Sequence, residues 1–108
     1  MASVYDVYGL RSRELGDQLD QLAAALDVRW EERHSEYRGV YHHAPVGDGE
    51  FLVQSNDLRD ESGSYLQLPN FPEHRFLLFV NEHDSPDDVR RRLGGLPQWE
   101  FLRRRTLD

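Results

Sequence analysis

The sequence predicts an α+β fold, a two-layer sandwich in which a mixed, mainly antiparallel sheet carries two helices on one face. Two segments repeat apolar residues at helical spacing, and six others are short strand-like runs separated by turn residues. Each helical segment lies between two strand-like segments, and right-handed crossovers bring both helices to the same face of the sheet. The 108 residues contain no repeat or linker, so we expect a single α+β domain over residues 1–108.

The first strand and the first helix are predicted from the N-terminal quarter of the chain. The segment SVYDVYG (3–9) is rich in Val and Tyr and ends at a glycine, which favours a strand. Ser12 can cap the helix that follows. Its apolar stripe is formed by Leu15, Leu19, Leu22 and Leu26. Because a stripe flanked by strands usually packs in the core, we do not interpret it as a partner-binding face.

Four more strands are predicted between the two helices. VRWEERH (28–34) alternates apolar and charged residues, as a half-exposed strand does. GVYHHAP (39–45) and EFLVQSN (50–56) are joined by VGDG, so a hairpin is expected. RFLLFVN (75–81) is apolar on both faces, which is typical of a central strand.

A second helix and a last strand complete the predicted fold. Ser85 can cap the helix, Pro86 fits its first position, and Asp87 and Asp88 face the positive end of its dipole. A pair of glycines ends the helix. WEFLRRR (99–105) then forms a strand whose arginines favour a sheet edge.

The triplet Glu82-His83-Asp84 connects the fifth strand to the second helix. The carboxyl end of a strand is a place where α/β proteins often hold chemistry. No second motif points to this loop, however, and such a triplet in a turn is usually a solvated connection. We therefore predict no catalytic residues.

The long connection 56–75 combines acidic and apolar residues, and connections of this length are uncommon in compact domains. This mixture is typical of a protein-recognition surface. The predicted partner-binding residues are Asp57, Asp60, Glu61, Tyr65, Leu68 and Phe71. The alternative is that the aromatic residues only cover the edge of the core, with YLQL as a short strand, and both interpretations stay open.

Composition limits the classes of function. No cysteine occurs, and all 13 basic residues are arginine with no lysine or isoleucine, which indicates a GC-rich bacterial genome. The net charge of −7 comes entirely from residues 1–75 and favours cationic partners over nucleic acid, despite the triplets Arg90–Arg92 and Arg103–Arg105. Neither a basic leader nor a long apolar run is present, so we expect a cytoplasmic protein with no membrane partner.

No metal or cofactor is predicted. The five histidines form no HExxH motif, and His42 and His43 are adjacent, so a strand would point them to opposite faces. No glycine-rich phosphate loop opens a helix. The chain is therefore not expected to be an enzyme.

The element order resembles a ferredoxin-like fold with an additional hairpin. A small, acidic, cysteine-free bacterial domain with an acidic and aromatic loop is also similar to the immunity proteins of bacterial polymorphic toxin systems. The similarity is one of type and rests on no diagnostic motif. It implies a cytoplasmic protein that binds and neutralises a cognate toxin through its acidic, aromatic surface.

Two alternatives from other classes remain. The exposed sheet face could hold a small molecule or a reaction, in a cleft lined by Tyr5, Trp30, His34, Tyr41 or His42. The chain could instead be a structural homodimer that joins by edge strands or sheet faces.

Overall fold

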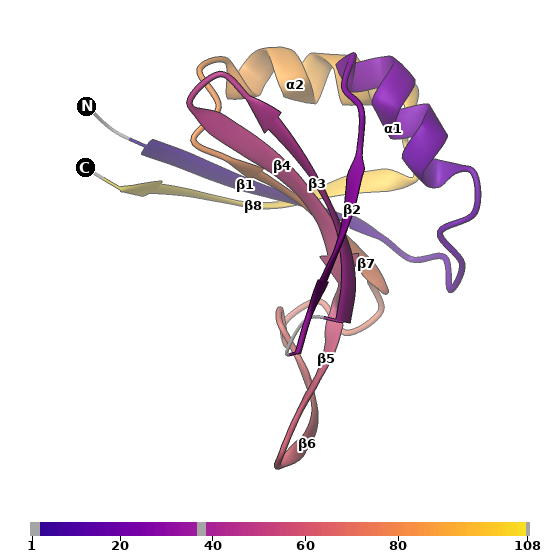
Figure 1. Ribbon diagram of the computed structural model, residues 1–108. Coiled ribbons are helices and arrows are strands. Elements are labelled where there is room, and N and C mark those ends of the chain that lie inside the picture. The colour runs from indigo at the N-terminus through magenta and orange to yellow at the C-terminus, as the bar shows by residue number, and fades with distance from the viewer. Residues whose placement is uncertain (1–2, 37–38, 108) are drawn as a thin grey trace.

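The computed structural model describes residues 3–36 and 39–107. Its main element is a six-stranded sheet with the order β2-β3-β4-β7-β1-β8 (Figure 1). In chain order its strands are β1 (Ser3–Leu10), β2 (Glu31–Ser35), β3 (Gly39–Val46), β4 (Gly49–Ser55), β7 (Phe76–Asn81) and β8 (Trp99–Leu107). Each pairing of these strands is antiparallel, where the prediction also allowed parallel neighbours. The predicted α+β class and mainly antiparallel sheet are confirmed.

Two helices, α1 (Gln18–Leu26) and α2 (Pro86–Arg92), lie on the same face of the sheet, as predicted (Figure 1). A 3₁₀ turn, η1 (Leu93–Gly95), extends α2. Helix α1 begins later than the sequence suggested because Gly16 has a φ of +47°, which is not helical. Ser12 caps no helix; its hydroxyl forms a local turn with Glu14. Among the described residues no helix is long and apolar enough to cross a membrane.

The main core lies between the sheet and the helices. From the helical elements it contains Leu22, Leu26, Val89 and Leu93. From the sheet it contains Tyr8, Leu10, Ala44, Phe51, Val53, Leu78, Val80 and Trp99. Trp30 packs against this core just before β2 and donates a hydrogen bond from Nε1 to the carbonyl of Leu19 (3.0 Å). The leucine stripe is therefore core, as predicted.

A second, smaller cluster lies on the face of the sheet that is turned away from the helices. Val7 and Leu77 are buried there, each next in sequence to a residue of the main core, because successive side chains of a strand point to opposite faces. Leu68 covers them from the connection before β7. Strand β7 is thus buried on both faces, which explains its uninterrupted apolar sequence.

The connection between β4 and β7 contains a second sheet of two strands, β5 (Asp57–Asp60) and β6 (Gly63–Leu66). This β5–β6 hairpin extends away from the body of the molecule (Figure 1). A short strand at YLQL was one of the two sequence interpretations, and β6 covers its first half. Strand β5 was not predicted because its sequence DLRD has the composition of a loop, and only its pairing with β6 makes it a strand.

Tyr8 provides the first test of the packing. Its side chain is 2% exposed, its ring packs edge-on against Phe101, and its hydroxyl is buried with no hydrogen-bond partner among the described residues. A buried, unpaired hydroxyl costs free energy that phenylalanine does not. We expect Tyr8→Phe to keep the fold and to raise the free energy of unfolding by about 1 kcal/mol, measured by urea denaturation.

The pH dependence of unfolding gives a second measurement on the same variant. Burial raises the pKa of Tyr8 to about 12 from a value of 10.0. The folded state therefore favours the neutral phenol, and this contribution is fully present below pH 10 and is lost as the pH rises towards 12. Tyr8→Phe should remove that loss, whereas lower stability of the variant at neutral pH would mean that the hydroxyl has a partner.

Candidate functional site

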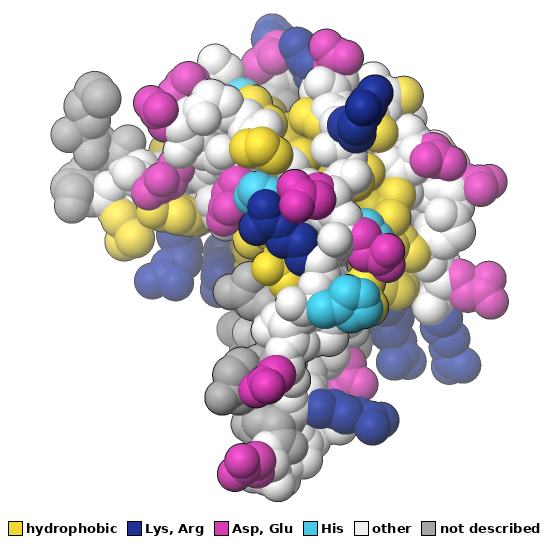
Figure 2. All heavy atoms as spheres, viewed as in Figure 1, with side chains coloured by type: hydrophobic (Ala, Val, Ile, Leu, Met, Phe, Trp, Pro, Cys, Tyr) yellow, Lys and Arg dark blue, Asp and Glu magenta, His cyan; other side chains and the backbone are white. Residues whose placement is uncertain are grey.

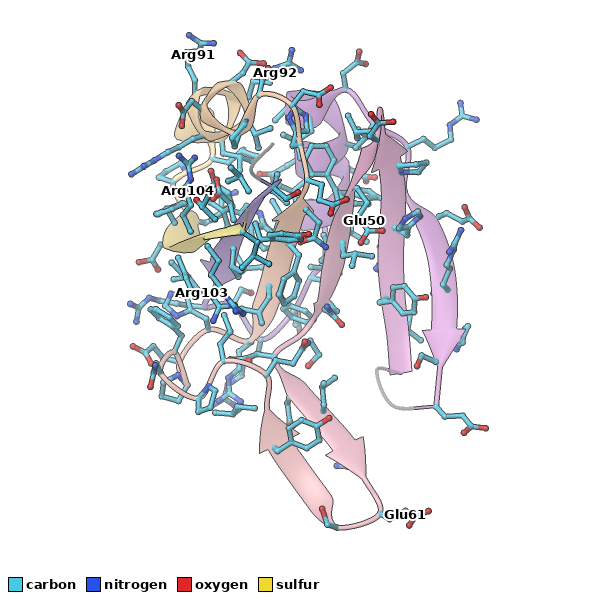
Figure 3. The ribbon with its side chains drawn as sticks, turned by 90° about the vertical axis from the view of Figure 1, so that its left-hand side faces the viewer. Glu50, Glu61, Arg91, Arg92, Arg103 and Arg104 are labelled. Atoms are coloured by element: carbon cyan, nitrogen blue, oxygen red, sulfur yellow. The ribbon has the colours of Figure 1, made fainter. Side chains whose placement is uncertain are left out.

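The β5–β6 hairpin carries part of the predicted partner-binding residues at its surface. Asp57 and Glu61 are exposed, and Figure 3 shows Glu61 at the tip of the hairpin. Tyr65 is 45% exposed although it lies directly opposite Leu58, which is 8% exposed. The backbone of Asp60 pairs with Gly63, and its side chain lies outside the described part of the structure. The hairpin therefore presents an aromatic ring and carboxylates to solvent.

Leu68 and Phe71 pack on the body of the molecule, and burial rules out the predicted partner contact for Leu68. Leu68 is 6% exposed and belongs to the second cluster, where a partner could not reach it. Phe71 packs against the same cluster, and its ring lies edge-on to that of His74 at 5.9 Å. For these two residues the alternative interpretation, a loop that covers the core, describes the structure.

Asn56 holds the base of the hairpin in place. It is 1% exposed, and its amide nitrogen donates to the carbonyls of Phe71 (3.0 Å) and His74 (2.9 Å). Its side-chain oxygen accepts from the backbone N–H of Leu68 (2.9 Å). Gln67 adds a bond from Nε2 to the carbonyl of Ser55 (2.9 Å). One buried amide thus fixes residues 68–74 against the end of β4.

The connection after β7 and the turn between β3 and β4 together form an acidic surface. The structure places Glu82 and Asp84 beside the turn between β3 and β4, which brings them near Asp48 and Glu50. We call these four residues the acidic end. Two adjoining hollows of about 380 and 370 Å³ lie there, and both are lined by Asp48 and Glu82. Gly49 makes the approach possible, because a Cβ at this position would lie 2.3 Å from the carbonyl oxygen of Asn81.

Hydrogen bonds orient two of the four carboxylates of the acidic end, those of Glu82 and Glu50. The hydroxyl of Tyr5 donates to Glu82 (2.6 Å), and this bond raises the pKa of Tyr5. Asn81 donates from Nδ2 to Glu50 (3.0 Å), whose other oxygen lies 3.0 Å from Nε2 of His43. Figure 3 shows Glu50 on the face of the sheet turned away from the helices. Such an arrangement attracts cations.

The structure does not support a reactive Glu-His-Asp triplet. His83 stacks on Phe51 with 5.5 Å between ring centroids, and its Nδ1 accepts a hydrogen bond from the backbone N–H of Ser85 (2.9 Å). These contacts give His83 a structural role at the start of α2. Within residues 3–36 and 39–107 no group of three or more His, Asp or Glu side chains could hold a metal ion.

The five residues proposed for a cleft on the exposed sheet face do not come together. Tyr5 and Tyr41 share that face, whereas His42 points to the helix side, where burial lowers its pKa. Trp30 belongs to the main core, and His34 is exposed on β2 at the edge of the sheet.

His43, which was not proposed from the sequence for any site, lines one of the two hollows of the acidic end. Two features of the sequence could have indicated this position. Tyr41 and His43 are two residues apart in a strand and so share one face, and the tight turn brings Glu50 next to them on the following strand.

Comparisons with known proteins give no relative for this chain: no family model, no curated protein and no solved structure matches it.

Proposed function

We propose that this protein binds a basic protein partner and neutralises it, as immunity proteins neutralise their cognate toxins. The β5–β6 hairpin is the proposed recognition element. The observation that carries the proposal is an exposed aromatic residue, Tyr65, on a hairpin that, within the described part of the chain, pairs with no strand of the main sheet. A two-stranded hairpin is marginally stable by itself, and this one contributes Leu58 as its buried apolar residue. Packing of the core therefore does not explain why an aromatic side chain is present at Tyr65.

The charge of the chain supports a basic partner. The sequence has 20 acidic and 13 basic residues. Asp57 and Glu61 lie on the same hairpin as Tyr65, and Figure 2 shows acidic side chains there together with a basic one. The acidic end adds negative charge at the other end of β4. Long-range attraction between exposed charges speeds the encounter with an oppositely charged protein, while desolvated aromatic anchors slow its dissociation.

Binding kinetics test this division of roles. Wild type and Tyr65→Ala are used side by side as bait in the native bacterium, and the protein captured by wild type is then purified. Neutralising the acids with Asp57→Asn and Glu61→Gln should lower the association rate and flatten its dependence on salt. Tyr65→Ala should mainly raise the dissociation rate, with a loss of about 2 kcal/mol in binding free energy.

Matched substitutions elsewhere on the surface are the controls. Asp20→Asn removes an exposed acid from α1, and Val40→Ala shortens an apolar side chain that is 44% exposed on β3. Neither should change the kinetics. A partner whose binding ignores every hairpin variant would reject the hairpin as the recognition element.

Neutralisation needs its own experiment. Expression of the captured partner alone should arrest bacterial growth, and co-expression of the wild-type chain should restore it. The Tyr65→Ala chain should restore growth less well at equal expression. A partner that binds through the hairpin but leaves growth unaffected would reject the immunity role while keeping the interaction.

A further inference from the structure

A third hollow, separate from the acidic end, lies at the base of the hairpin and has a volume of about 530 Å³. Its lining residues come from the ends of β4, β6 and β7, from the loops beside them and from the loop between β1 and α1. Figure 1 shows the ends of β4 and β7 where the hairpin leaves the body. Leu66, Pro72 and Phe76 give it apolar surface, and Arg13 and Arg75 give it positive charge. We infer that this hollow, the basal hollow, binds a small organic anion with an apolar body.

The two arginines are available for a ligand. Both are exposed, and no ion pair joins either guanidinium to an acid within the described residues. Arg11 and Arg104 show the contrast, since each contacts two carboxylates. Asp57 also lines the basal hollow, which leaves one positive charge in excess. Guanidinium groups form paired hydrogen bonds with carboxylate and phosphate oxygens, and these are the groups we assign to the ligand.

His74 supplies a polar group in the lining. It is 3% exposed, its Nε2 lies 3.3 Å from Oε1 of Glu100, and its buried Nδ1 has no partner among the described residues. When Nε2 carries the hydrogen and donates it to the Glu100 carboxylate, Nδ1 is an acceptor. That nitrogen is shut off from solvent, so it is not a contact point for a ligand that enters the hollow. The arginines and the apolar walls therefore set the ligand class, a small organic anion with an apolar body.

The walls of the basal hollow are fixed before any ligand arrives. Asn56, one of its lining residues, forms hydrogen bonds with both ends of residues 68–74, and the backbone N–H of Arg75 donates to the carbonyl of Leu10 (2.7 Å). Binding sites for small molecules are usually preformed in this way, and the volume falls in the range of such sites. Little of the binding free energy is then spent on ordering the chain.

The net charge of −7 does not prevent an anion from binding there. At physiological ionic strength, exposed charges more than about 8 Å apart are largely screened from one another. The charges next to the ligand therefore decide its affinity, and in the basal hollow Arg13 and Arg75 outweigh Asp57 by one positive charge.

A matched series of probes tests the charge requirement by NMR titration of the full chain. 4-Hydroxybenzoate and 4-hydroxyphenyl phosphate carry the anion, and 4-hydroxybenzamide has the same ring and hydroxyl without it. We expect one or both anions to give saturable shifts at the amides of Asp57, Leu66 and Phe76, and the amide probe to bind at least tenfold more weakly. The anion that binds more tightly identifies the class of ligand, carboxylate or phosphate.

Two double variants test the location. Arg13→Gln with Arg75→Gln should weaken binding of the tighter anion at least tenfold. Arg29→Gln with Arg105→Gln removes the same charge from exposed arginines outside the basal hollow and should leave the affinity unchanged. All four positions are at the surface, so the spectra should show an intact fold.

The inference is overturned if neither anion gives saturable shifts at millimolar concentrations or if the neutral probe binds as well as the anions. Equal weakening by the two double variants would also overturn it. Because no probe is a protein, these outcomes are independent of the proposed partner of the hairpin.

Discussion

Arg104→Ala is expected to lower the free energy of unfolding by about 3 kcal/mol. Asp6 is fully buried on β1, and Arg104 donates to both of its carboxylate oxygens, at 2.8 and 3.0 Å. The same guanidinium contacts Asp87 in the first turn of α2 (2.9 Å), and hydrogen bonds to the two acids raise the pKa of Arg104. Removing the Arg104 side chain leaves the buried carboxylate of Asp6 without a partner, and an unpaired buried charge lowers the stability of a protein strongly. Urea denaturation measures the loss.

Two further variants check that the loss comes from the unpaired acid. Arg105→Ala removes the neighbouring exposed arginine and should change stability by less than about 0.5 kcal/mol. Adding Asp6→Leu to Arg104→Leu removes both charges and should recover much of the stability, because a buried ion pair is often replaceable by apolar side chains. An Arg104→Ala protein as stable as wild type would show that Asp6 finds another partner or water.

Asn56→Ala should cost about 3 kcal/mol, since it removes three hydrogen bonds and leaves buried backbone groups unpaired. The groups left unpaired are the N–H of Leu68 and the carbonyl of His74, whereas the carbonyl of Phe71 keeps a hydrogen bond from the N–H of His74 (3.2 Å). Hydrogen exchange should therefore increase at residues 67–75 before it increases in β7. Calorimetry and exchange measured together separate this local loosening from global unfolding.

Asn70→Ala is the matched control, because Asn70 lies in the same segment with its side chain exposed. It should leave both measurements unchanged. Equal exchange rates in the Asn56→Ala and wild-type proteins at residues 67–75 would contradict the role of Asn56 as the fastening residue.

Local patterns were sufficient to predict the strands of the main sheet and both helices. The apolar run in β7 indicated a central strand because Leu77 and Leu78 each meet a different core cluster. The leucine stripe of α1 fixed its buried face for the same reason, since burial repeats with the period of the element. What these patterns do not contain is pairing between distant segments.

The parts that were missed depend on such pairing. The acidic end exists because β4 pairs with β7 in a register that brings Glu50 opposite Asn81. Arg104 meets Asp6 only because the pairing of β1 with β8 shifts between Val7 and Tyr8. Without that shift Arg103 would occupy this position. An irregularity of one residue therefore turned an arginine expected in solvent into the partner of a buried acid.

The separation of the β5–β6 hairpin from the main sheet also bears on how this protein can change over generations. Mutations at most positions of the hairpin leave both core clusters intact, because Leu58 is its buried apolar residue and the base is held by Asn56. Substitutions in the hairpin can then accumulate under natural selection without lowering the stability of the fold. We expect descendants of this chain to diverge fastest between residues 57 and 66 and to keep Asn56, Asp6 and Arg104.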